Sequence, residues 1–217
     1  MTKVLTVSRT FPAFHPKAGQ PTHFVEKLIE SFLTLGDIEI TDEQLKLCSW
    51  NVMRPDVWEK WHTIRVGNNW KVGDTFSPRV WSGKPYNSPQ ITIAPDIRVE
   101  KVWPIEMYIQ SGNGVTQLYI YNVCEGSKHK TKWINGTVKE IHDYYVDCTV
   151  WHRNELDFNN PHLHIPLRNI LAKNDGLSIA DFADWFLLSP DLEKGDFGVF
   201  DRKFSGQIIC WNKNIKY

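Results

Sequence analysis

The sequence has neither a net charge nor a long hydrophobic run. Its 25 lysine and arginine residues balance 25 aspartate and glutamate residues, so no overall field draws the chain to DNA, RNA or an anionic membrane. No window approaches the length of a membrane span, and residues 1–11 lack the hydrophobic stretch of a signal peptide. We therefore expect a cytoplasmic protein with no membrane partner, in which any contact with nucleic acid is local.

Cysteine is scarce and widely spaced. The four cysteines are Cys48, Cys124, Cys148 and Cys210. They offer no Cys-x-x-Cys metal knuckle, and without an export signal they are expected to be reduced thiols. The sequence also has no evident internal repeat or low-complexity segment. These absences exclude a disulfide scaffold and a zinc-finger design.

Tryptophan, in contrast, is abundant, with ten among 217 residues. Indole rings pack cores and interfaces, and they also stack on bases. Core packing is the expected role for most of them. The hydrophobic fraction of 41% and the charged fraction of 23% are those of an ordinary soluble protein, and the length suits one large domain, residues 1–217.

Hydrophobic periodicity predicts two helices and a series of short strands. The first helix follows Thr22 as its cap and ends at Gly36, and the second follows Ser178 and ends before Pro190. A short third helix is expected at 41–47, after a loop at 12–21. Strands are expected at 3–11, 62–66, 75–81, 90–94, 98–103 and 206–211. Short strands joined by small turns predict an α+β fold, a small mixed β-barrel flanked by helices.

Residues 110–165 are harder to place. They contain a strand-like run at 117–123, a basic loop at 128–132 and a second β-prone run at 144–151. We interpret the range as a β-rich segment inserted into the single domain.

The segment Lys60-x-x-Thr63-x-Arg65 is the strongest chemical motif. It runs directly into a predicted strand, where alternation places Thr63 and Arg65 on one face. In a barrel mouth, a desolvated Lys60 could take a proton from Thr63 while Arg65 bound a carbonyl or phosphate oxygen. From the pattern alone, the commoner interpretation is a pair of solvated basic residues at a strand entrance.

The order of several motifs resembles the ASCH domain, a family of the PUA-like superfamily. Lys60-x-x-Thr63-x-Arg65 is followed by Gly73-Asp74 before a strand, as in the ASCH signature. Downstream, the segment 172–178 resembles the part of that family where an acidic residue precedes the second helix, and 207–211 lies where its last barrel strand does. The resemblance covers the first helix, residues 60–103 and residues 171–211.

This resemblance implies a PUA-like barrel with a cleft for RNA or a modified nucleoside. Similar small bacterial proteins are acetylcytidine amidohydrolases, and other family members are reported as ribonucleases. Carried onto this chain, Thr63 is the nucleophile, Lys60 its base and Asp175 the acid that orients the lysine. Trp58 stands where the family usually has glycine, and Asp175 where it has glutamate.

Two further groups of residues are candidates for binding. A basic and aromatic stretch suits phosphate contact and base stacking, with a solvated hairpin as its alternative. Its members are Arg79, Trp81, Lys84 and Tyr86. The pair His162-x-His164, with His152 and Asp157 nearby, could face a metal, but such pairs are common by chance and no third ligand is fixed. We expect no metal and no cofactor.

Three functions are compatible with the sequence. The first is a hydrolase, an amidohydrolase or ribonuclease, that acts on a modified nucleoside or RNA. The second is an RNA-binding module without chemistry, and the third is a scaffold for a protein partner that binds the insertion. The sequence does not predict the oligomeric state.

Overall fold

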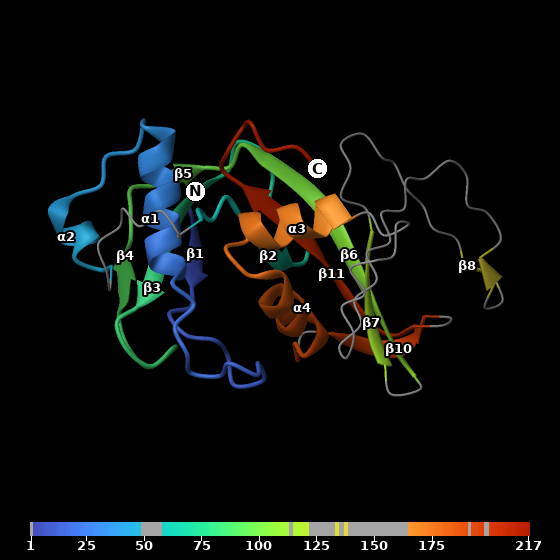
Figure 1. The fold of residues 1–217 in the computed structure, drawn as a ribbon. Coiled ribbons are helices and arrows are strands. Elements are labelled where there is room, and N and C mark those ends of the chain that lie inside the picture. The colour runs from blue at the N-terminus through green and yellow to red at the C-terminus, as the bar shows by residue number, and fades with distance from the viewer. Residues whose placement is uncertain are drawn as a thin grey trace.

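The computed structural model describes residues 2–48, 58–112, 115–121, 133–134, 137–138, 165–190, 192–197 and 200–217. Across these residues the chain forms a mixed α+β fold with two main sheets (Figure 1). The predicted α+β class is confirmed. The predicted barrel is wrong, since the two main sheets are not joined into a closed barrel in the described ranges.

The first sheet is built around β3 (Thr75–Trp81). On one edge β1 (Lys3–Val7) runs parallel to it, and on the other β4 (Gln90–Thr92) and β5 (Ile97–Arg98) pair antiparallel. A parallel pair needs a long crossover connection, and α1 (Phe24–Leu35) lies in the one between β1 and β3.

The second sheet is built around β11 (Phe200–Cys210). One edge of β11 pairs with β6 (Lys101–Gly112), and the other is shared by β10 (Glu193–Phe197) and β2 (His62–Val66). Beyond β6 the sheet continues with β7 (Val115–Tyr121). A separate pair joins β8 (Trp133–Ile134) to β9 (Thr137–Val138).

Strand pairing explains why the predicted barrel does not close. Strands β2 and β3 follow one another in the chain, yet β2 pairs with β11 and both edges of β3 are occupied by strands of the first sheet. No free edge of β3 is left for β2. The chain therefore changes sheets between Val66 and Thr75.

The remaining helices are α2 (Asp42–Leu45), α3 (Ile165–Asn174) and α4 (Ile179–Leu187). In Figure 1, α1 lies beside the first sheet and α3 and α4 lie against the second. The predicted cap of α1 is wrong by one residue: His23 is its N-cap, in a left-handed conformation, while the Thr22 hydroxyl accepts a bond from the Phe24 amide at 3.3 Å. The helix ends at Gly36, as predicted.

One hydrophobic core joins both sheets to the helices. Phe32 of α1 and Phe76 of β3 both pack on Trp211, with ring centroids 6.1 and 5.7 Å apart. The Trp211 indole also donates a hydrogen bond to the Ser31 hydroxyl at 3.2 Å. Each of these buried aromatic side chains contributes roughly 2–3 kcal/mol through burial alone. The contacts at Trp211, which directly follows β11, therefore hold the second sheet to α1 and the first sheet.

The other predicted elements agree with the structure to different degrees. The strands at 62–66 and 75–81 are confirmed, whereas the first strand ends at Val7, four residues earlier than predicted. The range 98–103 is divided between β5 and the start of β6. Helix α3 and strand β10 were not predicted. Most of the predicted insertion at 110–165, including the basic loop at 128–132, lies outside the described residues.

Candidate functional site

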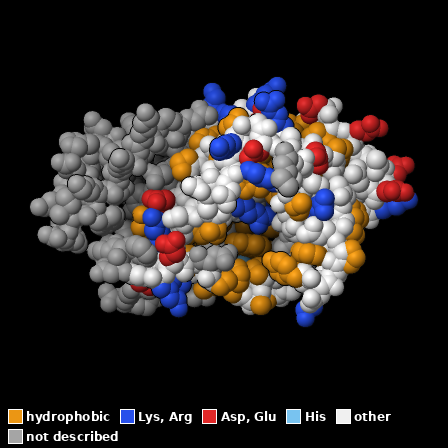
Figure 2. Space-filling view, turned by 180° about the vertical axis from the view of Figure 1, so that it is seen from behind, with side chains coloured by type: hydrophobic (Ala, Val, Ile, Leu, Met, Phe, Trp, Pro, Cys, Tyr) orange, Lys and Arg blue, Asp and Glu red, His pale blue; other side chains and the backbone are white. Residues whose placement is uncertain are grey.

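A cavity of about 400 Å³ lies where the two sheets meet α1 and α4. Its lining comes from β1, the start of α1, β2, the β3–β4 hairpin, the turn after α3, and α4. Viewed from behind, the molecule is hollowed near the middle of its face, where hydrophobic and basic side chains come together (Figure 2). A cavity of this size can hold a small ligand such as a nucleoside.

A buried ion pair, Lys60 with Asp175, contributes to the lining of this cavity. The Lys60 ammonium donates hydrogen bonds to the Asp175 backbone carbonyl at 2.5 Å and to its carboxylate. Lys60 is 2% exposed and Asp175 is 6% exposed. The Lys60 nitrogen also lies 4.5 Å from the centre of the Phe24 ring. Buried charges are retained only when they are paired, and this pair meets that requirement.

Burial shifts both groups toward their neutral forms. It lowers the pKa of Lys60, against the attraction of Asp175, and the positive charge of Arg65 lowers it further. Burial likewise raises the pKa of Asp175, against the attraction of Lys60. Both shifts oppose the charged forms, so Lys60 gives up its proton more readily than an exposed lysine does.

Thr63 and Arg65 reach the cavity from β2. In the ladder with β11, Thr63 lies opposite Ile209 and Arg65 opposite Gln207, two residues apart, so both side chains leave the same face of the strand. The Arg65 guanidinium donates to the Thr6 carbonyl at 2.7 Å. A side chain at Gly206 would collide with the Arg65 carbonyl, which explains the glycine at that point.

The backbone of residues 60 and 61 is fixed by three segments at once. The Lys60 amide donates to the Lys27 carbonyl of α1 at 3.1 Å, and the Trp61 amide to the Asn174 carbonyl of α3 at 2.7 Å. The Trp211 amide donates to the Trp61 carbonyl at 3.3 Å. These bonds hold Lys60 in place between α1 and the end of α3.

Asp175 is positioned by the way α3 ends. The amide of Gly176, which has a φ of +76°, donates to the Lys173 carbonyl, and the Leu177 amide donates to the Ala172 carbonyl, both at 2.9 Å. This is the Schellman pattern of helix termination, and it makes Asp175 the last residue before the left-handed glycine. The local sequence Asp-Gly after a helix therefore aims the acid at Lys60.

His62 lies on the other side of β2. It is fully buried, its Nδ1 hydrogen-bonds the Tyr217 hydroxyl, and that hydroxyl also accepts a bond from the side-chain amide nitrogen (Nδ2) of Asn174 at 3.1 Å. Burial, followed by the positive charge of Lys60, lowers the pKa of His62 well below its ordinary value. The imidazole is consequently neutral at physiological pH and serves packing behind the site.

Two aromatic side chains contribute to one wall of the cavity. The Trp81 and Tyr86 rings are 5.4 Å apart, and Tyr86 is 88% exposed. Tyr86 has a φ of +64°, a conformation that costs a bulky residue energy. The hairpin that carries it is tied by bonds from the Ser82 amide to the Pro89 carbonyl at 2.9 Å and from the Gly83 amide to the Ser88 hydroxyl at 3.0 Å.

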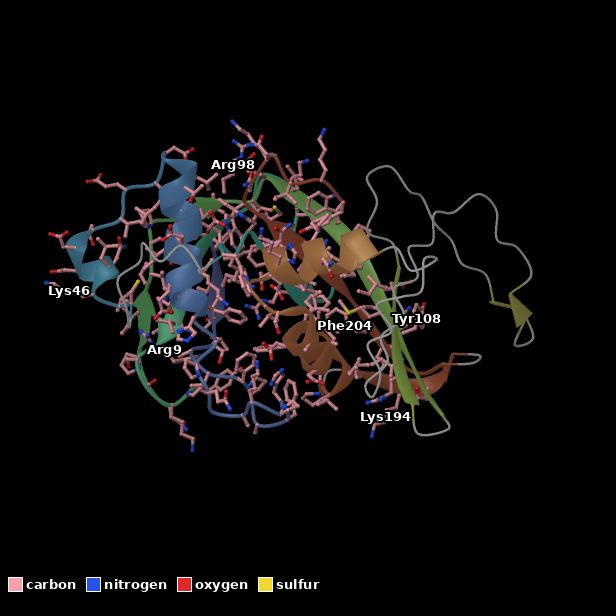
Figure 3. All side chains as sticks on the ribbon, viewed as in Figure 1. Arg9, Lys46, Arg98, Tyr108, Lys194 and Phe204 are labelled. Carbon is pink, nitrogen blue, oxygen red and sulfur yellow. The ribbon has the colours of Figure 1, made fainter. Side chains whose placement is uncertain are left out.

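A second aromatic cluster, centred on Trp185 of α4, contributes to another part of the cavity wall. Its ring lies 5.7 Å from Phe24 and 5.9 Å from Phe11. The neighbouring Phe186 packs on Phe204 of β11 at 5.3 Å, and Figure 3 places Phe204 close to α4. Aromatic rings around buried charges favour a flat, partly apolar ligand.

The structure gathers six of the eight predicted site residues around the cavity. They are Lys60, Thr63, Arg65, Trp81, Tyr86 and Asp175. The other two do not line it: Arg79 donates to the Ser77 hydroxyl at 3.2 Å, and Lys84 is exposed on the hairpin turn. The residues His152, Asp157, His162 and His164 lie outside the described residues. No group of metal-ligating side chains occurs in the part of the chain that the structure describes.

Sequence reasoning missed several residues at or near the site. Phe24, Trp185 and Phe186 are apolar residues of predicted helices, and in the sequence a residue that lines a cavity looks the same as one that packs in the core. Only the fold shows that these three line the cavity. Lys27 was missed as well, although its position beside Val25 and Leu28 places a lysine at the edge of the buried face of α1. No local pattern connects it to Lys60, which is 33 positions away.

Comparisons with known proteins provide no further assignment, since no family model, curated protein or solved structure matches this chain. Across the described ranges, no helix has the length and apolar character to cross a membrane.

Proposed function

We propose that the cavity binds a modified nucleoside or a base of single-stranded RNA, in an ASCH-like, PUA-like protein, and that it hydrolyses an amide on that ligand. The observation that carries this proposal is the buried Lys60–Asp175 pair, which lines a cavity together with Thr63 and Arg65. Perturbed titratable groups in an enclosed cleft are typical of sites for proton transfer.

Each side chain has a role in the proposed reaction. Lys60, as the neutral amine, takes the proton of the Thr63 hydroxyl, whose oxygen attacks the carbonyl carbon of the amide. Arg65 stabilises the negative charge on the carbonyl oxygen, and the C–N bond breaks as Lys60 returns the proton to the leaving nitrogen. Water then attacks the ester on Thr63, releasing the acid and restoring the threonine hydroxyl. Asp175 holds the lysine in place throughout.

The aromatic walls support a planar ligand. Trp81 and Tyr86 line one side of the cavity, and base stacking on aromatic rings contributes about 1–3 kcal/mol per base. The exposed Tyr86 suits a base at the entrance better than one deep inside. An amide such as that of acetylcytidine would then reach the Lys60–Asp175 pair.

A second candidate function is recognition without chemistry. The ammonium of Lys60 is bound to both the carbonyl and the carboxylate of Asp175, which is also the arrangement of a structural ion pair. In that case Arg65 and the aromatic residues bind RNA and nothing is hydrolysed. Phosphate contacts would then make the affinity fall as salt is raised.

The experiment measures the turnover of acetylcytidine by wild type, Thr63→Val and Thr63→Ser. Chromatography quantifies the two products, cytidine and acetate. Valine keeps the shape and the strand preference of threonine but removes the hydroxyl, whereas serine keeps the hydroxyl. We expect valine to abolish turnover and serine to retain it. Equal turnover in wild type and the valine variant excludes threonine as nucleophile.

The binding arm uses fluorescence anisotropy of short single-stranded RNA at two salt concentrations. Salt-sensitive binding without turnover supports the recognition module, and neither binding nor turnover rejects both proposals.

A further inference from the structure

Two lysines from distant parts of the chain hold the turn that carries Asp175. The Lys60 ammonium donates to the Asp175 carbonyl at 2.5 Å, and the Lys27 ammonium donates to the next carbonyl, that of Gly176, also at 2.5 Å. The Lys60 amide donates in turn to the Lys27 carbonyl at 3.1 Å. Helix α1, the entrance to β2 and the end of α3 are thus joined through these two side chains.

Gly176 allows both lysines to approach. A Cβ atom on this residue would lie 3.2 Å from Cδ of Lys27 and 3.3 Å from Cβ of Lys60, closer than side chains normally pack. The stems of the two lysines therefore rest on the glycine. Both stems would have to shift by a few tenths of an ångström if the turn carried a side chain.

The two ammonium groups also affect each other. Burial and, after it, the charge of Lys60 lower the pKa of Lys27 to about 8, against the opposing attraction of Asp181, Glu26 and Asp175. The repulsion between two charges acts equally on both. Lys60 faces Asp175 and Arg65 as well, so charges on the turn after α3 and on β2 also shift its proton affinity.

We propose that Lys27 is a positioning residue of this site, which acts through the Gly176 turn and Lys60 and does not touch the ligand. The inference rests on the proposed function. Lys27 fastens the Gly176 carbonyl to α1, and its positive charge, which repels that of Lys60, favours the proton-free amine that takes the threonine proton. The absence of Lys27 from the cavity lining agrees with this indirect role.

The test uses Lys27→Met, which removes both the charge and the donor, and Lys27→Arg, which keeps both. The first readout is independent of turnover: the side-chain ¹⁵N signal of Lys60, assigned by its loss in Lys60→Arg, is followed against pH. We expect the pKa of Lys60 to rise in Lys27→Met and to stay near the wild-type value in Lys27→Arg. An unchanged Lys60 titration in a folded Lys27→Met variant overturns the proposal.

The second readout is the pH profile of acetylcytidine hydrolysis. In Lys27→Met we expect kcat to fall about tenfold with KM unchanged, and the acidic limb to move to higher pH. Lys27→Arg should restore both. A rise in KM alone would mean that Lys27 binds ligand, which contradicts the proposal. If wild type shows no turnover, the proposed hydrolysis fails, while the Lys60 titration still decides whether the two lysines are coupled.

Discussion

At the scale of single residues, the Lys60–Asp175 pair is the most costly feature of the site. Both partners are almost fully buried, and desolvation opposes their charges before any attraction is counted. An arrangement of this kind is poorly explained by stability, because well-packed apolar residues would serve as well. Under the proposed function, the pair serves proton transfer in the cavity.

Removing one partner of the pair should therefore destabilise the protein strongly. We expect Lys60→Met to lower the free energy of unfolding by about 3–5 kcal/mol, because it leaves Asp175 buried without a partner. The double variant Lys60→Met/Asp175→Asn should recover part of this loss. Urea denaturation measures both.

The matched control is the partly exposed pair of Lys203 and Glu106, 2.8 Å apart, whose side chains are 20% and 27% exposed. The variant Lys203→Met should cost less than about 1 kcal/mol, as surface pairs do. Equal losses at the two pairs would mean that the Lys60–Asp175 pair is effectively solvated.

Lys27 gives the stability a pH dependence of defined sign. Its folded pKa of about 8 lies below the ordinary 10.5, so between these values the unfolded chain binds more protons than the folded one. The contribution of Lys27 to stability therefore rises from pH 8 to 10.5. Urea denaturation of wild type and Lys27→Met across that pH range isolates this contribution. A difference in the free energy of unfolding that stays constant with pH would contradict the lowered pKa of Lys27.

At the scale of elements, the site depends on how α3 ends. Gly176 and Gly36 both end helices with almost the same left-handed φ, +76° and +77°. A Cβ at Gly36 would meet nothing within 4 Å, whereas one at Gly176 would press on Lys27 and Lys60. An alanine at Gly36 therefore reports the cost of the left-handed backbone alone, and an alanine at Gly176 adds the cost of crowding the two lysines.

We expect Gly36→Ala to cost about 1–2 kcal/mol from the left-handed conformation alone. Gly176→Ala should cost more and should also reduce acetylcytidine turnover, because the two lysines have to move. Thermal unfolding and kinetics on both variants test this. If Gly36→Ala and Gly176→Ala lose the same stability and both keep full turnover, Gly176 has no part in the function of the site.

The hairpin between β3 and β4 holds Tyr86 in a strained conformation at the cavity. Glycine adopts this conformation freely, so Tyr86→Gly should raise the free energy of unfolding by about 1 kcal/mol while weakening ligand binding. Denaturation and anisotropy with single-stranded RNA check the two effects. Unchanged affinity in this variant would exclude stacking on Tyr86.

At the scale of the whole molecule, the sequence predicted what local patterns encode. The strands at 62–66 and 75–81, the end of α1 at Gly36 and the cap of α4 at Ser178 follow from alternation, glycine and capping chemistry. Alternation also placed Thr63 and Arg65 on the face that lines the cavity. These features need no knowledge of distant residues.

What the sequence did not predict depends on contacts between distant segments. Strand β11 pairs with β2 and β6, far from it in sequence, and the number of sheets follows from that pairing. The role proposed for Lys27 rests on a bond to a carbonyl 149 positions away. The meeting of Lys60 and Asp175, 115 positions apart, was predicted only through resemblance to the ASCH family.

The measurement that tests the central claim most directly is acetylcytidine turnover by wild type, Lys60→Ala and the control Lys213→Ala, whose lysine is exposed and outside the cavity lining. The account predicts that wild type and Lys213→Ala release cytidine at equal rates and that Lys60→Ala, shown to be folded by circular dichroism, releases none. Turnover in Lys60→Ala at the wild-type rate would contradict it.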